Sequence, residues 1–140
     1  MARLSALIWK TSEGAAQITT LPCVTEVAFN VTPRTNSNGF EVHYRLHSAR
    51  VQFVAGDLMP VGEAQGSGPP PAPNRRDDRI IEDRYAGLTS PTDVKRRLTL
   101  VLTSALKPAM ASLDVSVFDV TEKGELKNVA EDTVAISFNL

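Results

Sequence analysis

Hydrophobic and polar residues alternate with a period of two in several stretches of this chain. The clearest stretches are residues 26–31, 41–47 and 133–140, in which every second position holds a branched aliphatic or aromatic side chain. Successive side chains of a β-strand point to opposite faces of its sheet, so each stretch predicts a strand with one buried face. Residues 79–88 predict a further strand.

Two hairpins are predicted at the ends of the chain. Residues 4–21 form the first, and its two apolar arms are joined at Ser12-Glu13-Gly14, where glycine readily takes the positive φ of a turn. Residues 115–140 form the second, with its turn at Glu122-Lys123-Gly124-Glu125. Both assignments place antiparallel neighbours at the edges of the predicted sheet.

The alternation changes phase at Ser48-Ala49. Apolar residues occupy even positions up to Leu46 and odd positions at Val51 and Phe53. One extra residue at this point predicts either a β-bulge in one long strand or a tight turn between two strands. Residues 59–78, which are rich in glycine and proline, predict a long loop.

The segment after residue 88 decides the predicted fold class. Ser90, Pro91 and Asp93 suit the N-cap and the first turn of a helix. The apolar residues that follow recur at helical spacing: Val94, Leu98, Val101, Leu102, Ala105 and Leu106. This pattern predicts an amphipathic helix over 91–107 and a short second helix over 109–113.

The main prediction is therefore an α+β fold. An N-terminal hairpin and an antiparallel β-meander precede the amphipathic helix and the short second helix, which pack on one sheet face, and a C-terminal β-hairpin is added. Residues 97–104 also alternate, as a strand would. The alternative is an all-β sandwich in which 97–104 is a strand and the terminal hairpin completes the second sheet.

Composition narrows the class of protein. The 140 residues are the size of one domain, and a hydrophobic content of 42% suffices for a core. No apolar run has the length of a membrane span, and the first residues lack the pattern of a secretory signal peptide. The single cysteine, Cys23, cannot form a disulfide within the chain and is interpreted as a small apolar residue.

Charge is distributed unevenly. Residues 1–113 carry 13 Lys and Arg against 10 Asp and Glu, a net charge of +3, whereas residues 114–140 carry 2 against 6, a net charge of −4. A mildly basic body is a weak indication of an anionic partner. Any contact with nucleic acid is expected to be local.

No catalytic residue, cofactor, metal ion or small-molecule substrate is predicted, so the protein is not interpreted as an enzyme. His43 and His47 lie on one strand, where four residues span roughly 13 Å, too far for two ligands of one zinc ion. No serine, nor Cys23, stands in a nucleophile motif. The acids of residues 77–83 alternate with arginines, which is typical of a solvated segment.

One strand face holds most of the remaining polar chemistry. Allowing for the extra residue at 48–49, this face carries Glu41, His43, Arg45, His47, Arg50 and Gln52. The opposite, apolar side is expected to lie under the 91–107 helix. Arginine and histidine suit phosphates, and glutamine suits bases or hydroxyls, so this face is predicted to contact phosphates or bases. The other interpretation is a solvated face without a ligand.

Several segments resemble a known family. They are the opening Met1-Ala2-Arg3-Leu4, Arg50-Val51-Gln52-Phe53, the loop 62–76, Ser90-Pro91-Thr92-Asp93-Val94-Lys95-Arg96-Arg97, and Leu102 with Leu106-Lys107-Pro108. In this order they resemble the coat proteins of single-stranded RNA bacteriophages, the leviviruses, over residues 1–113. The resemblance implies a homodimer with interlocked helices, a closed shell, and single-stranded RNA, including an operator hairpin, on the inner sheet face. It implies RNA contacts at Arg50 and Gln52, and further RNA contacts are predicted at Arg45, His43 and His47. It also implies location in the virion, after synthesis in the cytoplasm of a bacterial host.

Residues 114–140 depart from that family, whose members end soon after the second helix. The chain is therefore divided into a coat-protein-like part, residues 1–113, and an acidic, strand-forming extension, residues 114–140. The main functional prediction is a self-assembling, RNA-binding capsid protein with no membrane partner. The alternative is a small β-sandwich binding or adaptor module, such as a phage head-decoration or tail component.

Overall fold

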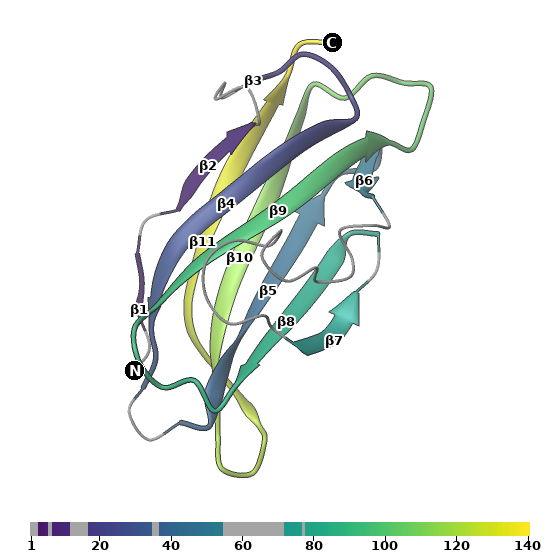
Figure 1. Ribbon diagram of the computed structural model, residues 1–140. Coiled ribbons are helices and arrows are strands. Elements are labelled where there is room, and N and C mark those ends of the chain that lie inside the picture. Colours follow the sequence, from purple (N-terminus) through teal and green to yellow (C-terminus); the bar gives the residue numbers. More distant parts are fainter. Residues whose placement is uncertain (1–2, 6, 12–16, 35–36, 55–71, 77) are drawn as a thin grey trace.

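The computed structural model describes residues 3–5, 7–11, 17–34, 37–54, 72–76 and 78–140, and the regular elements in these ranges are β-strands in two facing sheets (Figure 1). The five-stranded sheet contains β1 (Arg3–Leu4), β2 (Ile8–Thr11), β4 (Cys23–Thr32), β6 (Val51–Phe53) and β9 (Thr92–Leu102). The six-stranded sheet contains β3 (Gln17–Ile18), β5 (Gly39–His47), β7 (Ala72–Arg76), β8 (Ile80–Ala86), β10 (Met110–Val120) and β11 (Leu126–Phe138).

Neighbouring strands are antiparallel in both sheets, apart from the parallel pair β3 and β11. In the five-stranded sheet β4 and β9 are central, with β1 and β2 against the other side of β4 and β6 against β9. In the six-stranded sheet the order is β3-β11-β10-β5-β8-β7. Because β3 pairs with β11 only at Ser137 and Phe138, no described strand is paired with the rest of that edge of β11.

The hydrophobic core lies between the sheets and is built from alternate residues of both. Val27 and Phe29 of β4 and Val42 and Tyr44 of β5 are buried in it. The rings of Phe29 and Tyr44 meet between the two sheets, with centroids 6.4 Å apart. The strands predicted over 26–31 and 41–47 are therefore confirmed, because the period of two places their apolar positions inward.

The predicted α+β fold class is wrong, and the all-β sandwich is the observed architecture. Residues predicted as helices over 91–107 and 109–113 instead contribute to β9 and β10. The inward positions of β9 include Arg96, which is 1% exposed and donates from Nε to Asp83 Oδ2 of β8 at 2.9 Å. This charged residue at an inward position interrupts the alternation of apolar and polar residues in β9. The residues before it, which are typical of a helix start, therefore favoured the incorrect prediction of a helix.

The N-terminal hairpin is also a wrong prediction. β1 and β2 pair with β4, whereas β3 pairs with β11 in the other sheet. The two predicted arms therefore lie in different sheets, because each completes an edge that a neighbour distant in sequence provides. The predicted turn at residues 12–14 lies outside the described residues.

The change of phase at residues 48–49 marks a turn between two strands, not a bulge. β5 ends at His47, and β6 begins at Val51 and pairs with β9 in the other sheet. The apolar side of β5 is consequently covered by a second sheet and not by a helix. Residues 41–53 do not form one continuous face.

The long loop predicted over 59–78 is only partly described. Residues 55–71 and 77 lie outside the described ranges, whereas residues 72–76 form β7, which is a strand and not a loop. β7 lies at the edge of its sheet and contains Pro73. An edge strand tolerates proline, since a residue there can do without one ladder hydrogen bond.

The C-terminal hairpin is confirmed and is longer than predicted. β10 and β11 pair from Met110 opposite Ser137 to Val120 opposite Leu126. The strand predicted over 79–88 is confirmed as β8. The boundary drawn between residues 113 and 114 falls inside β10, which is paired with β5 on its other side. Among the described residues, no helix is long and apolar enough to cross a membrane.

Candidate functional site

Side chains on the outer face of the six-stranded sheet form rows across its strands. Ser116 of β10 lies opposite His43 of β5, and His43 lies opposite Glu82 of β8. On the other side of Ser116, Glu131 of β11 continues the row. Opposite residues of antiparallel strands hold their side chains about 5 Å apart, so four residues distant in sequence become neighbours.

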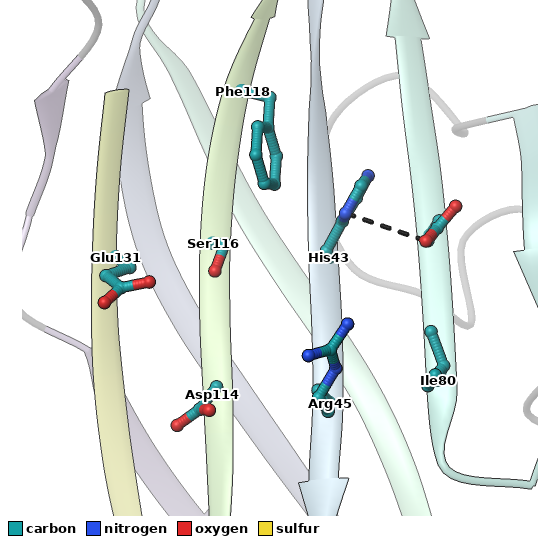
Figure 2. Close-up of a pocket in the computed structure, with 8 residues that line it drawn as sticks. His43, Arg45, Ile80, Asp114, Ser116, Phe118 and Glu131 are labelled. Carbon is teal, nitrogen blue, oxygen red and sulfur yellow. Dashed lines mark ion pairs between the residues drawn. The ribbon is translucent and has the colours of Figure 1, made fainter. Parts of the chain in front are cut away.

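A pocket of about 230 Å³ opens over this row (Figure 2). Its lining residues are His43, Arg45, Ile80, Glu82, Asp114, Ser116, Phe118 and Glu131. Ser116 has the smallest side chain of the set, and Asp114 and Phe118 follow on the same face of β10. The hollow is therefore a consequence of one small residue between larger ones.

A buried carboxylate supports the side of the pocket formed by β5 and β8. The Glu41 side chain is 0% exposed, although it shares the outward face of β5 with His43. Its Oε1 lies 2.8 Å from His43 Nε2, and the Arg84 guanidinium donates to its Oε2. His43 Nδ1 lies 3.7 Å from Glu82 Oε2, so the imidazole stands between two carboxylates. A carboxylate can be buried at this position because two cationic or hydrogen-bonding groups contact it.

His43 also contacts an aromatic wall. Its ring centroid lies 4.5 Å from that of Phe118, with the two planes at 40°. This contact and the ion pair to Glu41 limit the orientations available to the imidazole. One wall of the pocket is therefore made of His43 and Phe118, and the buried carboxylate of Glu41 holds His43 in place.

A second histidine–carboxylate pair lies at the other end of the pocket. His47 Nε2 is 2.6 Å from Asp114 Oδ2, and Thr133 Oγ1 donates to Asp114 Oδ1 at 2.8 Å. Burial raises the pKa of Asp114, but the hydrogen bonds from Thr133 and His47, with the charges of His47 and Arg45, outweigh it and lower the pKa overall. Asp114 therefore holds a negative charge in the pocket at neutral pH.

The residues predicted to contact RNA do not share one surface. His43 and Arg45 line the pocket and His47 lies beside it, all on β5. Arg50 stands in the turn before β6 and donates from Nη1 to the carbonyl of Lys107 at 2.9 Å. Gln52 lies in the other sheet, opposite Val101. The RNA contacts stay a prediction, divided between two faces of the molecule.

Sequence analysis did not identify the part of the pocket that β10 and β11 provide. Asp114, Ser116 and Phe118 recur with a period of two, which indicates that they share one face, and Glu131 lies in the partner arm of the hairpin. Nothing in the local sequence indicates that β10 lies beside β5. The pairing joins residues about 70 positions apart, such as Ser116 and His43. No short sequence motif specifies which distant strands pair or in which register.

Comparison with known proteins identifies the fold alone. No family model matches the chain, and no curated protein matches it. The cohesin module of a family 33 glycoside hydrolase from Clostridium perfringens is similar in structure, with a TM-score of 0.57, 6% identity and coverage of 97% of both chains. The sixth cohesin of Acetivibrio cellulolyticus scaffoldin B, solved in complex with a Cel5 dockerin, has a TM-score of 0.50 and 7% identity, covering 96% of this chain and 100% of that one.

A collagen-binding adhesin has the same architecture. The Enterococcus faecalis surface protein ACE is similar with a TM-score of 0.54 and 10% identity, and the match covers 94% of this chain and 50% of that chain. The chain is therefore a small β-sandwich of the kind that occurs in cohesin and adhesin modules.

Proposed function

We propose that this protein is a non-catalytic binding module that recognises a protein partner through the outer face of its six-stranded sheet. The observation that carries the proposal is the pocket over Ser116. Three carboxylates line it (Glu82, Asp114 and Glu131) against one guanidinium, so its net charge is −2 while His43 is neutral. The fitting occupant is a lysine or arginine side chain of the partner, with its charge at the carboxylates and its methylene stem along Phe118.

The structural neighbours support a binding role without supplying a partner. The Acetivibrio cohesin is in complex with a dockerin, and the Enterococcus adhesin binds its ligands by the collagen Hug model. Both matches lie at or below 10% identity, so only their architecture is shared with this chain. A β-sandwich presents broad, rigid sheet faces, and such faces suit contact with another protein.

Two observations count against the hypothesis that this protein is an RNA-binding capsid protein. Arg45 lines the same pocket as three carboxylates, which repel phosphate groups. The helices whose exchange was expected to hold the coat-protein dimer are absent from the described residues, since β9 and β10 occupy their place. A protein partner therefore fits this face better than RNA does.

The proposal is tested by selecting peptides from a random displayed library against the immobilised full chain. Selected peptides are expected to be enriched in lysine or arginine. Glu131→Gln should weaken their binding roughly three- to tenfold, because one carboxylate is lost without a change of shape. Ser116→Trp, which fills the pocket, should abolish binding.

Lys95→Trp serves as the matched control, because Lys95 is exposed on the outer face of the other sheet. This variant should bind the selected peptides as the parent chain does. Peptides without basic residues, or equal binding to Ser116→Trp and the parent, would exclude the pocket as the binding site. If the parent chain binds single-stranded RNA tightly and Arg45→Ala loses this binding, the result would favour the hypothesis that this face binds nucleic acid.

A further inference from the structure

We infer that Glu41, His43 and Glu82 form a binding site for a divalent transition-metal ion of the zinc type. One donor atom from each of the three side chains lies within 4.8 Å of the other two. Glu41 and His43 are two residues apart on β5, and Glu82 lies opposite His43 on β8. The sheet therefore places an imidazole and two carboxylates at adjacent positions of one face, an N and O donor set that zinc accepts.

The two carboxylates lie beside different nitrogens of the His43 ring. His43 Nε2 lies 2.8 Å from Glu41 Oε1, and His43 Nδ1 lies 3.7 Å from Glu82 Oε2. Ligand atoms around a tetrahedral zinc ion, at metal–ligand distances of about 2.0–2.2 Å, lie roughly 3.4 Å apart. A zinc ion binds a single ring nitrogen, so binding through Nε2 requires the Glu82 carboxylate to rotate from Nδ1 towards Nε2.

Burial distinguishes this cluster from an ordinary group of surface acids. The side chain of Glu41 is 0% exposed, that of His43 19% and that of Glu82 17%. Water competes weakly with ligands in such surroundings, and a partly desolvated pair of carboxylates gains more from a cation than an exposed pair does.

Arg84 limits the affinity and orients one ligand. Its guanidinium holds Glu41 Oε2, so Oε1 is the oxygen directed at His43. The two carboxylates and the imidazole supply the oxygen and nitrogen donors that a divalent cation of the zinc type binds. Without the metal, the same groups remain stable as an ion-pair network, so the fold does not depend on the ion.

The site shares His43 and Glu82 with the proposed peptide pocket, and Glu41 is the ligand that does not line the pocket. Its ligands come from β5 and β8, whereas the distinctive residues of the pocket, Ser116 and Glu131, come from β10 and β11. Three protein ligands leave one tetrahedral position for water. The two proposals are tested separately, because Ser116→Trp and Glu131→Gln change the pocket without removing a metal ligand.

The test is calorimetric titration of ZnCl₂ into the full chain after dialysis against a chelator. One equivalent is expected to bind and to raise the thermal unfolding temperature. Co²⁺ bound in place of Zn²⁺ should give the visible absorption of a tetrahedral N/O site. His43→Ala and Glu82→Gln should each weaken Zn²⁺ binding at least about tenfold.

His47→Ala is the matched control, because His47 also pairs with a carboxylate, Asp114, at 2.6 Å but has no second acid in a comparable cluster. It should bind Zn²⁺ as the parent does. Circular dichroism melts without metal establish that each variant is folded, and Glu82→Gln decides the matter if His43→Ala is not. Absence of saturable binding, or an equal loss in His47→Ala, would overturn the inference.

Discussion

Gly39 begins β5 in a backbone conformation that only glycine adopts without strain. Its φ is 112°, and a Cβ there would overlap the carbonyl oxygen of Tyr85 and lie 2.8 Å from the nitrogen of Gly87. Asn38 fixes the chain on both sides, since its N–H donates to Val120 O at 2.8 Å and its carbonyl accepts from Gly87 N at 2.9 Å. Backbone atoms therefore surround this position and cannot move aside independently.

We expect Gly39→Ala to lower the free energy of unfolding by about 3 kcal/mol, because left-handed strain and steric overlap add. Gly124→Ala is the control: its φ is 78°, but no atom lies within 4 Å of the added Cβ. That variant should lose only about 1–2 kcal/mol. Urea denaturation measures both, and equal losses would show that the overlap at Gly39 is relieved elsewhere.

Tyr44 places a hydroxyl group in the core without a hydrogen-bond partner among the described residues. The side chain is fully buried, and its OH has no hydrogen-bond partner among the described residues. Burial raises the pKa of Tyr44 well above its usual value, Tyr85 and Asp83 raise it further, and Arg96 partly offsets this. The phenol therefore stays neutral in the folded protein well into the alkaline range.

Replacing this residue by phenylalanine is expected to stabilise the protein. Tyr44→Phe removes an unsatisfied buried polar group and keeps the ring, so the free energy of unfolding should rise by about 1 kcal/mol. Tyr85→Phe, whose ring stacks on Phe40 with centroids 4.6 Å apart, should bring no such gain. Chemical denaturation distinguishes the two, and a loss of stability in Tyr44→Phe would mean that its hydroxyl has a partner.

Asp114 makes stability depend on acid pH. Its pKa is lowered in the folded state, so the stability it contributes is present above its ordinary pKa and is lost as the pH falls towards the folded value. The parent should therefore lose stability more steeply than Asp114→Asn between about pH 5 and pH 3. Urea midpoints over this range test the prediction, and parallel profiles would contradict it. The effect is small, since the side chain is 38% exposed.

At the scale of the elements, the buried ion pair between Arg96 and Asp83 joins the two sheets. Arg96 is 1% exposed and Asp83 is 0% exposed, so neither charge can recover its hydration if the other is removed. Arg96→Met alone should lower the free energy of unfolding by about 3–5 kcal/mol. The double variant with Asp83→Leu should lose clearly less than the sum of the two single losses. A double-mutant cycle in urea measures this coupling, and additive losses would exclude it.

β8 could be predicted although Asp83 is buried at one of its inward positions, and the other predicted strands are those whose inward positions are all apolar. Residues 26–31 and 133–140 belong to this group, and their alternation identified them correctly. The segment of β9 was wrongly predicted to be a helix, because Arg96 occupies an inward position and because Ser90 and Pro91 are typical of a helix start. The sequence of this segment indicates only its local preference for helix or strand. The segment forms a strand because β9 pairs with β4.

At the scale of the whole molecule, the candidate site could be predicted only along one strand. His43, Arg45 and His47 share a face of β5 because a strand has a period of two. Gln52 left that face because the turn after His47 carries the chain into the other sheet. The remaining walls come from β8, β10 and β11, and which strands adjoin β5 depends on packing that the alternation does not specify.

The incomplete pairing of β11 has a consequence for how copies of this protein meet. Along residues 126–136, β11 presents backbone groups that no described strand pairs, and such an edge is a template for edge-to-edge association. If two copies paired antiparallel about this point, the exposed Glu131 of each copy would lie opposite the exposed Asp132 of the other. We expect Glu131→Thr with Asp132→Thr to self-associate in sedimentation velocity at concentrations where the parent sediments as a single smaller species. The two acids then protect the protein from self-association, because their like charges disfavour the pairing of this edge with the same edge of a second copy.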